Sequence, residues 1–248
     1  MCRFSVRLGI ALSLSVSAAA GALAQSPEWK NTAEVYFMGG AISGTTAVGP
    51  VEAQVDLSAS QLLNNLQFGA MLNYRGETET YAVNADVVFM GLGATRDSAN
   101  GLLTTKVDAD QWIIQAHGSW RVTPVLEVLG GLRFTSIADT VVQTPVRGDA
   151  RTAELTKSWF DPIVGVRAKV PVGKGWSVEG YGDIGGFGVG CDLTWMLQGR
   201  VNWQISPLVG VGLGYRALYQ NYSSGSGSDY FRWKITMQGP LAAVNVSF

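Results

Sequence analysis

Residues 192–203 alternate between polar and apolar side chains without a break. One set of alternate positions is apolar or glycine: Leu193, Trp195, Leu197, Gly199, Val201 and Trp203. The intervening set is mostly polar: Asp192, Thr194, Met196, Gln198, Arg200 and Asn202. Because successive side chains of a β-strand point to opposite faces, this pattern predicts a strand with one apolar and one polar face.

The spacing of the tryptophans on this strand indicates its surroundings. Trp195 and Trp203 are eight residues apart. At a rise of roughly 3.4 Å per residue and a tilt of about 40°, they lie on the order of 20 Å apart along a membrane normal, close to the ~25 Å apolar band of an outer-membrane barrel. The strand is therefore predicted to span a membrane, with its apolar face toward lipid and its polar face toward a lumen.

The same alternation recurs along most of the chain after residue 33. Trp112 and Trp120 repeat the tryptophan spacing, which predicts an aromatic girdle made of Trp112, Trp120, Trp195 and Trp203. The pattern predicts an all-β, closed antiparallel transmembrane barrel of about ten strands, with eight or twelve as alternatives. Short turns at 123–124, 173–174 and 206–207 are expected on the periplasmic side. Longer loops, including 95–103 and 144–157, are expected outside.

Two segments do not follow a simple hairpin pattern. Residues 41–66 lack sustained alternation, although Val51–Leu57 would suit a short strand and 58–66 a short helix capped by Ser58 or Ser60. This segment is expected to form a folded outer loop or, alternatively, a plug in the barrel mouth. In the last strand, the side chains expected to face outward are Phe231, Trp233, Ile235, Met237, Ala242, Val244, Val246 and Phe248. They change parity, which predicts a β-bulge at Gly239-Pro240.

Composition supports a barrel and excludes some alternatives. The chain has 18 Lys+Arg against 19 Asp+Glu, which gives no nucleic-acid signature. No run of about 18 apolar residues follows the N-terminal region, so no transmembrane helix is expected there, and a membrane protein without such helices must close its sheet. Residues 1–24 are predicted to be a signal peptide, with basic Arg3 and Arg7, an apolar segment over 8–20 and an A-x-A site.

The predicted mature chain, 25–248, is a single barrel domain. It keeps only Cys191, because Cys2 precedes the apolar segment, so no intramolecular disulfide is expected. The charged side chains on the lumen face are expected to pair with one another, because an unpaired buried charge is costly. The predicted network consists of Glu34, Asp86, Glu127, Arg133, Asp161, Arg167, Glu179, Asp183, Arg200 and Arg216. No metal or cofactor is expected.

These motifs support a resemblance to a group of proteins. The chain resembles the small outer-membrane β-barrel proteins of Gram-negative bacteria, which are OmpA-like or OmpW-like in architecture. It is most similar to a poorly characterised subset with a DLS-x-S-x-LL-x-NL-x-F stretch, here 56–68, and a GDIGGFGVGSDLTW segment, here 182–195. Cys191 stands where this subset would have serine.

The resemblance also implies a location and partners. It implies the cell outer membrane, contact with outer-membrane lipid and lipopolysaccharide, and delivery by periplasmic chaperones to the barrel-assembly machinery. In such barrels the C-terminal Val244, Val246 and Phe248 would form the assembly signal.

The expected function is non-enzymatic, in a structural or surface-interaction role. One alternative is a narrow channel for small polar solutes or ions. Another is a lipid A-modifying hydrolase. His117 and Ser119 share the lumen face, Glu127 would orient the histidine, and the arrangement resembles that of lipid A deacylase barrels. However, His117 is predicted to lie near the periplasmic end, far from lipid A in the outer leaflet.

Overall fold

A computed structural model describes residues 28–97, 103–145 and 149–248. The predicted signal peptide and Cys2 lie outside these ranges. The described elements are β1 (Lys30–Met38), β2 (Ala41–Val48), β3 (Val51–Leu57), α1 (Ala59–Asn65), β4 (Leu66–Glu77), β5 (Tyr81–Asp97), β6 (Leu103–Thr123), β7 (Leu126–Pro145), β8 (Arg151–Gly173), β9 (Trp176–Gly185), β10 (Leu193–Gln204), β11 (Val209–Ser224), the 3₁₀ turn η1 (Gly227–Asp229) and β12 (Phe231–Ser247). None of the helices in the described ranges is long and apolar enough to cross a membrane.

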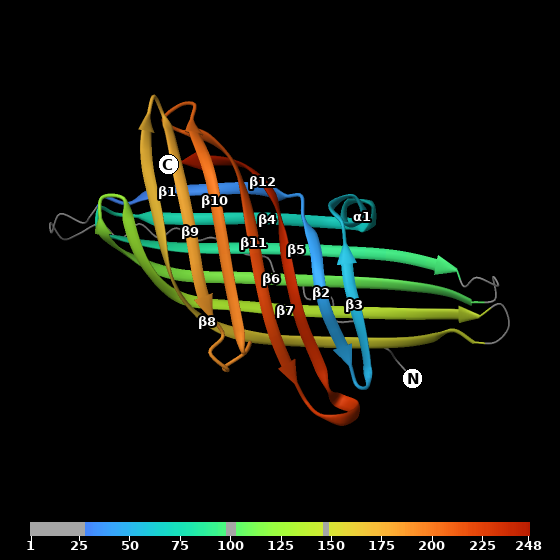
Figure 1. Ribbon diagram of the computed structural model, residues 1–248. Coiled ribbons are helices and arrows are strands. Elements are labelled where there is room, and N and C mark those ends of the chain that lie inside the picture. The colour runs from blue at the N-terminus through green and yellow to red at the C-terminus, as the bar shows by residue number, and fades with distance from the viewer. Residues whose placement is uncertain (1–27, 98–102, 146–148) are drawn as a thin grey trace, which may run out of the picture.

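Ten strands close into an antiparallel barrel, as the sequence predicts. The ring runs from β1 through β4 to β12 in chain order, and β12 pairs with β1 to complete it. The tight turns of the ten-strand ring gather at the left and top of Figure 1, and its longer connections lie at the right and bottom. By the usual asymmetry of bacterial barrels, the first end is periplasmic and the second is external.

The segment predicted to be an outer loop is largely part of the wall. β2 pairs with the external half of β12, from Gln238 to Phe231. β1 pairs with the periplasmic half of the same strand, from Ser247 to Leu241. β3 then pairs with β2 and forms the edge of the sheet. The loop prediction was therefore wrong for Ala41–Val48, whereas the short strand suggested at Val51–Leu57 is confirmed as β3. β2 is short and its alternation is interrupted around Gly44, so the sequence pattern did not mark it as a strand.

The predicted short helix is present and begins as expected. Ser58 caps α1: its Oγ accepts a hydrogen bond from Gln61 N at 3.4 Å, and Ser58 N donates to Gln61 Oε1 at 2.9 Å. This reciprocal capping box satisfies backbone donors that a helix leaves free at its first turn. Leu62 points from α1 toward the lumen, so one side chain of the segment occupies the barrel mouth.

The described residues of the long outer loops predicted at 95–103 and 144–157 are mostly strand. β5 has 17 residues, β6 21, β7 20 and β8 23, and these strands run far to the right in Figure 1. A strand that leaves the membrane meets water on both faces, so its sequence need not alternate. For that reason the sequence pattern predicted loops where these polar strand extensions lie. Residues 98–102 and 146–148 lie outside the described ranges.

The β-bulge predicted at Gly239-Pro240 in the last strand is wrong. Phe231, Ile235 and Met237 are only 2%, 0% and 4% exposed and point into the lumen, whereas Val244 and Val246 face outward. The β11–β12 register runs without interruption from Val209↔Val246 to Ser224↔Phe231. Parity therefore never changes at Gly239-Pro240. The apolar residues of β12 face lipid in its periplasmic half and face the lumen in its external half, because the external half of the lumen is itself apolar.

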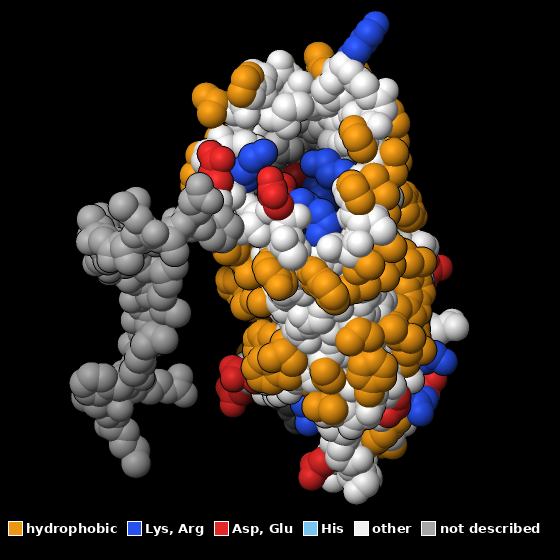
Figure 2. Space-filling view, turned by 90° about the vertical axis from the view of Figure 1, so that its left-hand side faces the viewer, with side chains coloured by type: hydrophobic (Ala, Val, Ile, Leu, Met, Phe, Trp, Pro, Cys, Tyr) orange, Lys and Arg blue, Asp and Glu red, His pale blue; other side chains and the backbone are white. Residues whose placement is uncertain are grey.

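The exterior of the barrel is an apolar belt, visible as the hydrophobic wall in Figure 2. Trp112, Trp120 and Trp203 are exposed on it, and Trp195 is half-buried against Tyr219 at a ring-centroid distance of 5.8 Å. Water would oppose so much exposed apolar surface, whereas lipid tails favour it. This closed barrel therefore spans a membrane, and a β-barrel with short turns at one end is the architecture of the bacterial outer membrane.

Candidate functional site

The periplasmic half of the lumen is crossed by ion pairs between strands. The carboxylate of Glu127 on β7 forms ion pairs with three arginines. Arg75 Nη2 lies 2.7 Å from Glu127 Oε1, Arg121 Nη2 lies 3.2 Å from it, and Arg167 Nη1 lies 3.4 Å from it. Glu77 shares two of them, because Arg75 and Arg121 both approach its Oε2, at 3.0 and 3.1 Å. Three cations are therefore held by two carboxylates beside the turn that joins β6 to β7.

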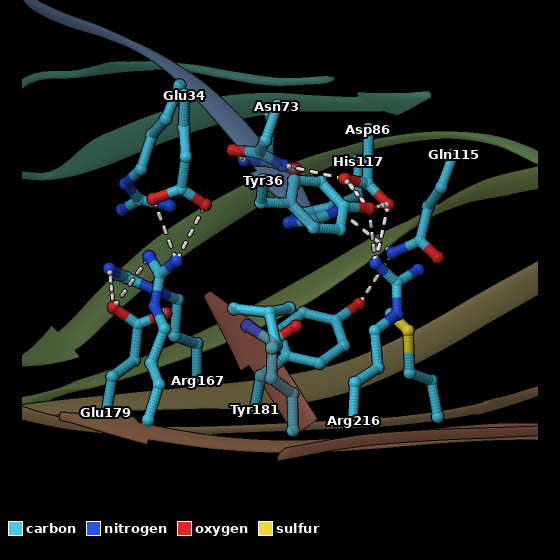
Figure 3. Close-up of a pocket in the computed structure, with 16 residues that line it drawn as sticks. Glu34, Tyr36, Asn73, Asp86, Gln115, His117, Arg167, Glu179, Tyr181 and Arg216 are labelled. Carbon is cyan, nitrogen blue, oxygen red and sulfur yellow. Dashed lines mark hydrogen bonds and ion pairs between the residues drawn. The ribbon is translucent and has the colours of Figure 1, made fainter. Parts of the chain in front are cut away.

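The pairs continue across the barrel to β1 (Figure 3). Arg167 Nη2 lies 2.8 Å from Glu179 Oε2, and Arg200 Nε lies 3.2 Å from Glu179 Oε1. Arg200 Nη1 then donates to Glu34 Oε1 at 2.8 Å. An unbroken chain of alternating charges thus runs from β4 through β7, β8, β9 and β10 to β1. Charges in such a chain are each compensated, which removes the main penalty for placing them inside the membrane.

A second cluster lies further toward the outside, around Arg216. Its Nη1 donates to Tyr36 Oη at 2.6 Å and to Asp86 Oδ2 at 3.0 Å, and the Tyr36 hydroxyl donates to Asp86 Oδ1 at 2.9 Å. All three side chains are buried and come from β11, β1 and β5. Figure 3 shows the three side chains pointing toward one another.

A third cluster surrounds Arg133, which is completely buried. Its Nη2 donates to both oxygens of Asp183, at 2.8 and 2.6 Å, and to Gln115 Oε1 at 2.7 Å. Its Nε also donates to Gln115 Oε1, at 3.0 Å, and its Nη1 donates to Thr194 Oγ1 at 2.9 Å. Tyr181 donates to Asp183 Oδ2 at 2.7 Å. The guanidinium therefore joins β6, β7, β9 and β10.

Asp161 differs from the other acidic residues predicted for this network. It is fully buried, but its carboxylate accepts hydrogen bonds from Cys191 N at 2.6 Å and from Trp159 Nε1 at 3.2 Å instead of meeting an arginine. The acid thus fixes the connection between β9 and β10. Burial, with the Asp161 carboxylate nearby, raises the pKa of the Cys191 thiol, so the thiolate form is disfavoured.

The histidine and serine proposed as a hydrolase pair have other partners. Ser119 Oγ donates to Glu127 Oε2 at 3.3 Å, and His117 Nδ1 lies 3.4 Å from Gln115 Nε2. Glu127 is in turn occupied by the three arginines. A nucleophilic serine needs its base within hydrogen-bond reach, with a third group that orients the base. The hydrogen bonds of these three side chains do not form that arrangement.

The outer half of the lumen is apolar, which the prediction of a polar lumen missed. Its buried side chains come from α1 and eight strands, and they form one contact cluster: Tyr36, Ile42, Leu62, Met71, Val88, Met90, Ile113, Met196, Leu218, Ile235, Met237, Leu241 and Ala243. A signal for it exists in the sequence. Met71, Val88, Met90 and Ile113 all occupy lumen-facing positions of strands that carry polar residues at the same parity nearer the periplasm.

A vestibule opens from the charged layer toward the periplasm. Its volume is about 680 Å³, and Figure 2 shows the hollow with lysine, arginine and acidic side chains inside it. Lys30, Lys169 and Asn202 line it together with the arginines of the ion-pair chain. Beyond that chain the space narrows to a cavity of about 60 Å³, which residues of the chain line together with Tyr36 and Arg216.

Comparisons with known proteins add only general likenesses of fold. No protein-family model matches the chain, and no curated protein matches its sequence. Among solved structures, it is similar to the outer-membrane protease OmpT of Escherichia coli, with a TM-score of 0.49 and 9% identity over 92% of this chain and 99% of that one. It is also similar to the translocator domain of the autotransporter NalP from Neisseria meningitidis, with a TM-score of 0.43 and 11% identity over 88% of each chain. A third is Ail, the attachment invasion locus protein of Yersinia pestis, with a TM-score of 0.37 and 8% identity over 90% of this chain and 100% of that one. These identities and TM-scores are too low to support an inference about activity. Any such inference must come from this chain's own side chains.

Proposed function

We propose that this protein is a non-catalytic outer-membrane barrel with a structural or surface-interaction role. The observation that carries the proposal is the double closure of the lumen. A layer of paired charges seals the periplasmic half, and a layer of packed apolar side chains seals the outer half. Such a barrel resembles a protein core more than a pore.

Conduction would require both layers to open. The charged layer is interlocked, because Glu127, Glu179 and Arg200 each serve more than one partner. Moving one side chain would leave others as uncompensated charges, which costs several kcal/mol per ion in a low-dielectric interior. The apolar layer adds a second barrier, since a hydrophobic constriction excludes water and ions. These costs favour the structural role over the channel.

The outer face supports an interaction role. β5 to β8 extend well beyond the apolar belt and form a four-stranded sheet on one side of the barrel mouth (Figure 1). The extension carries its own polar contacts, such as Lys106 Nζ to Asp108 Oδ2 at 2.8 Å and Gln67 Nε2 to Asp108 Oδ1 at 2.9 Å. It would present a formed surface to lipopolysaccharide or to another cell.

The C-terminal strand supports the proposed partnership with the barrel-assembly machinery. Val244, Val246 and Phe248 are all exposed on the lipid side of β12, at the periplasmic end. An assembly factor in the periplasm would meet these three side chains before the strand pairs with β1.

Planar-bilayer recording tests the closed lumen. Purified protein inserted into a lipid bilayer should give no steady single-channel steps. Steady steps of one amplitude would contradict the proposal and support the channel. Heat-modifiable migration on a denaturing gel is the control that the inserted protein is folded, and a known porin measured in the same bilayer is the positive control.

A further inference from the structure

The vestibule at the periplasmic mouth carries two lysines that the ion pairs of the lumen do not use. Lys30 on β1 and Lys169 on β8 both line it, and both side chains are exposed. Neither ammonium forms an ion pair with a carboxylate of the described residues. The other cations of the vestibule wall, Arg75, Arg167 and Arg200, are each held by a carboxylate.

The carboxylates next to these lysines are already occupied. Glu77 lies opposite Lys30 in the register of β1 and β4, and two arginines approach its Oε2. Glu179 lies opposite Lys169 in the register of β8 and β9, and two arginines also pair with it. The two lysines therefore add two positive charges to a network that is balanced without them. That network holds four arginines and four acids: Arg75, Arg121, Arg167, Arg200, Glu34, Glu77, Glu127 and Glu179.

The two ammoniums approach the vestibule from opposite walls. β1 and β8 are five strands apart in either direction around the ten-strand ring. Lys30 has the lumen-facing parity of Glu34, and Lys169 has that of Arg167, so both side chains point inward. An anion with a single charged group can approach one ammonium closely. A ligand that pairs with both needs an anionic group at each end.

The size and the walls of the vestibule suit a small polar ligand. Its volume of about 680 Å³ falls within the range of about 300–1,000 Å³ that is usual for small-molecule sites. A concave surface with an excess of one charge also concentrates ions of the opposite charge. Hydroxyl and amide groups that can hydrogen-bond a ligand lie on the wall together with the two lysines: Thr32, Asn73, Ser177, Gln204, Asn245 and Ser247.

We propose that the vestibule binds a small linear dicarboxylate, with one carboxylate paired to Lys30 and the other to Lys169. Such a ligand neutralises both surplus charges and leaves every arginine in its present ion pair. Lysine carries its charge on a flexible four-carbon stem, so the two side chains can adjust to the length of the ligand. The proposal is independent of the structural role proposed above, because a ligand at the mouth leaves both closing layers in place.

Isothermal titration calorimetry tests the site. The full-length mature protein, folded in detergent micelles at low ionic strength, is titrated with glutarate, with pentanoate and with inorganic phosphate. Glutarate should bind at one saturable site and weaken as salt is added. Pentanoate has the same number of carbons but one carboxylate, and phosphate is compact, so both should bind at least about fivefold more weakly. No saturable binding of glutarate, or binding of either comparison anion as tightly as glutarate, would overturn the proposal.

Three variants test the two contacts. Lys30→Gln and Lys169→Gln should each weaken glutarate about fivefold, because each removes one ion pair. In either variant glutarate should bind no more tightly than pentanoate, since only one ammonium remains. Lys234→Gln is the matched control, because Lys234 is exposed in the external half of β12, and it should leave glutarate binding unchanged. If either vestibule variant keeps the original affinity, or if the control loses as much, the assignment fails. Heat-modifiable migration verifies that each variant is folded.

Discussion

Replacing Arg133 by methionine is the sharpest test of the charged lumen. The guanidinium is completely buried and donates to Gln115, Asp183 and Thr194 from three of its nitrogens. Methionine fills similar space but offers no donor. Among the described side chains, Asp183 would then keep one hydrogen-bond donor, the hydroxyl of Tyr181 at 2.7 Å, and its charge would have no cation in contact.

The expected loss follows from that uncompensated carboxylate. Breaking a buried ion pair by removing one partner costs about 3–5 kcal/mol, so Arg133→Met should lower the free energy of unfolding by that amount. Adding Asp183→Asn removes the stranded charge but keeps an oxygen for Tyr181. The double variant should therefore recover about 2 kcal/mol relative to the single one.

Urea unfolding of the protein in lipid vesicles, followed by tryptophan fluorescence, measures these differences if the slope with urea stays constant. The matched control is Arg232→Met. Arg232 Nη1 lies 4.0 Å from Glu52, and their side chains are 43% and 59% exposed, so the loss should stay below about 1 kcal/mol. An Arg133→Met loss no larger than that of the control would refute the reasoning, as would a double variant less stable than the single one.

Four further outcomes are expected. Tyr215→Arg should lower the free energy of unfolding in vesicles by about 2–4 kcal/mol, because Tyr215 faces lipid and pairs with Gly199, midway between the two tryptophans of β10; a neutral effect would place this face away from lipid. Deletion of Phe248 should reduce the amount of barrel recovered from the outer membrane, and unchanged amounts would remove the proposed assembly signal. Cys191 should resist a water-soluble maleimide in the folded protein and react after unfolding, since it is fully buried and its thiol pKa is raised by burial; fast labelling of the folded form would contradict this. Lipid A mass spectra should not change on expression, and a change that a Ser119→Ala variant abolishes would establish a hydrolase.

Most of the barrel was predictable because lipid and lumen impose opposite demands on alternate residues. Where that contrast is strong, as along β10, the sequence identifies both the strand and the direction of its side chains. The orientation of Glu127 and Arg200 toward the lumen follows from that contrast alone. The contrast also predicts a ring of about ten strands and leaves eight or twelve open, and the structure has ten. The capping box of α1 was equally local, since Ser58 and Gln61 are three residues apart.

The errors arose where the contrast is inverted or disappears. In the outer half of β12 the apolar residues face the lumen and the opposite face is polar, so Phe231 and Ile235 were assigned to lipid when they pack in the lumen. Only the register with β11 decides the direction, and register depends on a partner strand. The extensions of β5 to β8 failed for the opposite reason, because water surrounds both faces and no apolar set marks them.

The pairing within the lumen was also beyond the reach of the sequence pattern. Alternation shows that Asp161 and Arg133 face inward, but it does not say which residues meet across the barrel. That depends on strand stagger, which sets the height of each side chain along the axis. The stagger brings Arg133 to Asp183 and leaves Asp161 to hold the backbone at Cys191.

The most direct test of the account is a spin-label scan along β10, from residue 194 to 203, in a Cys191→Ser background. Electron paramagnetic resonance in lipid vesicles gives the oxygen accessibility of each label. The account predicts period-two maxima at odd positions, including Trp195 and Trp203, because these side chains face lipid. Maxima at even positions such as Arg200, or no alternation at all, would contradict it.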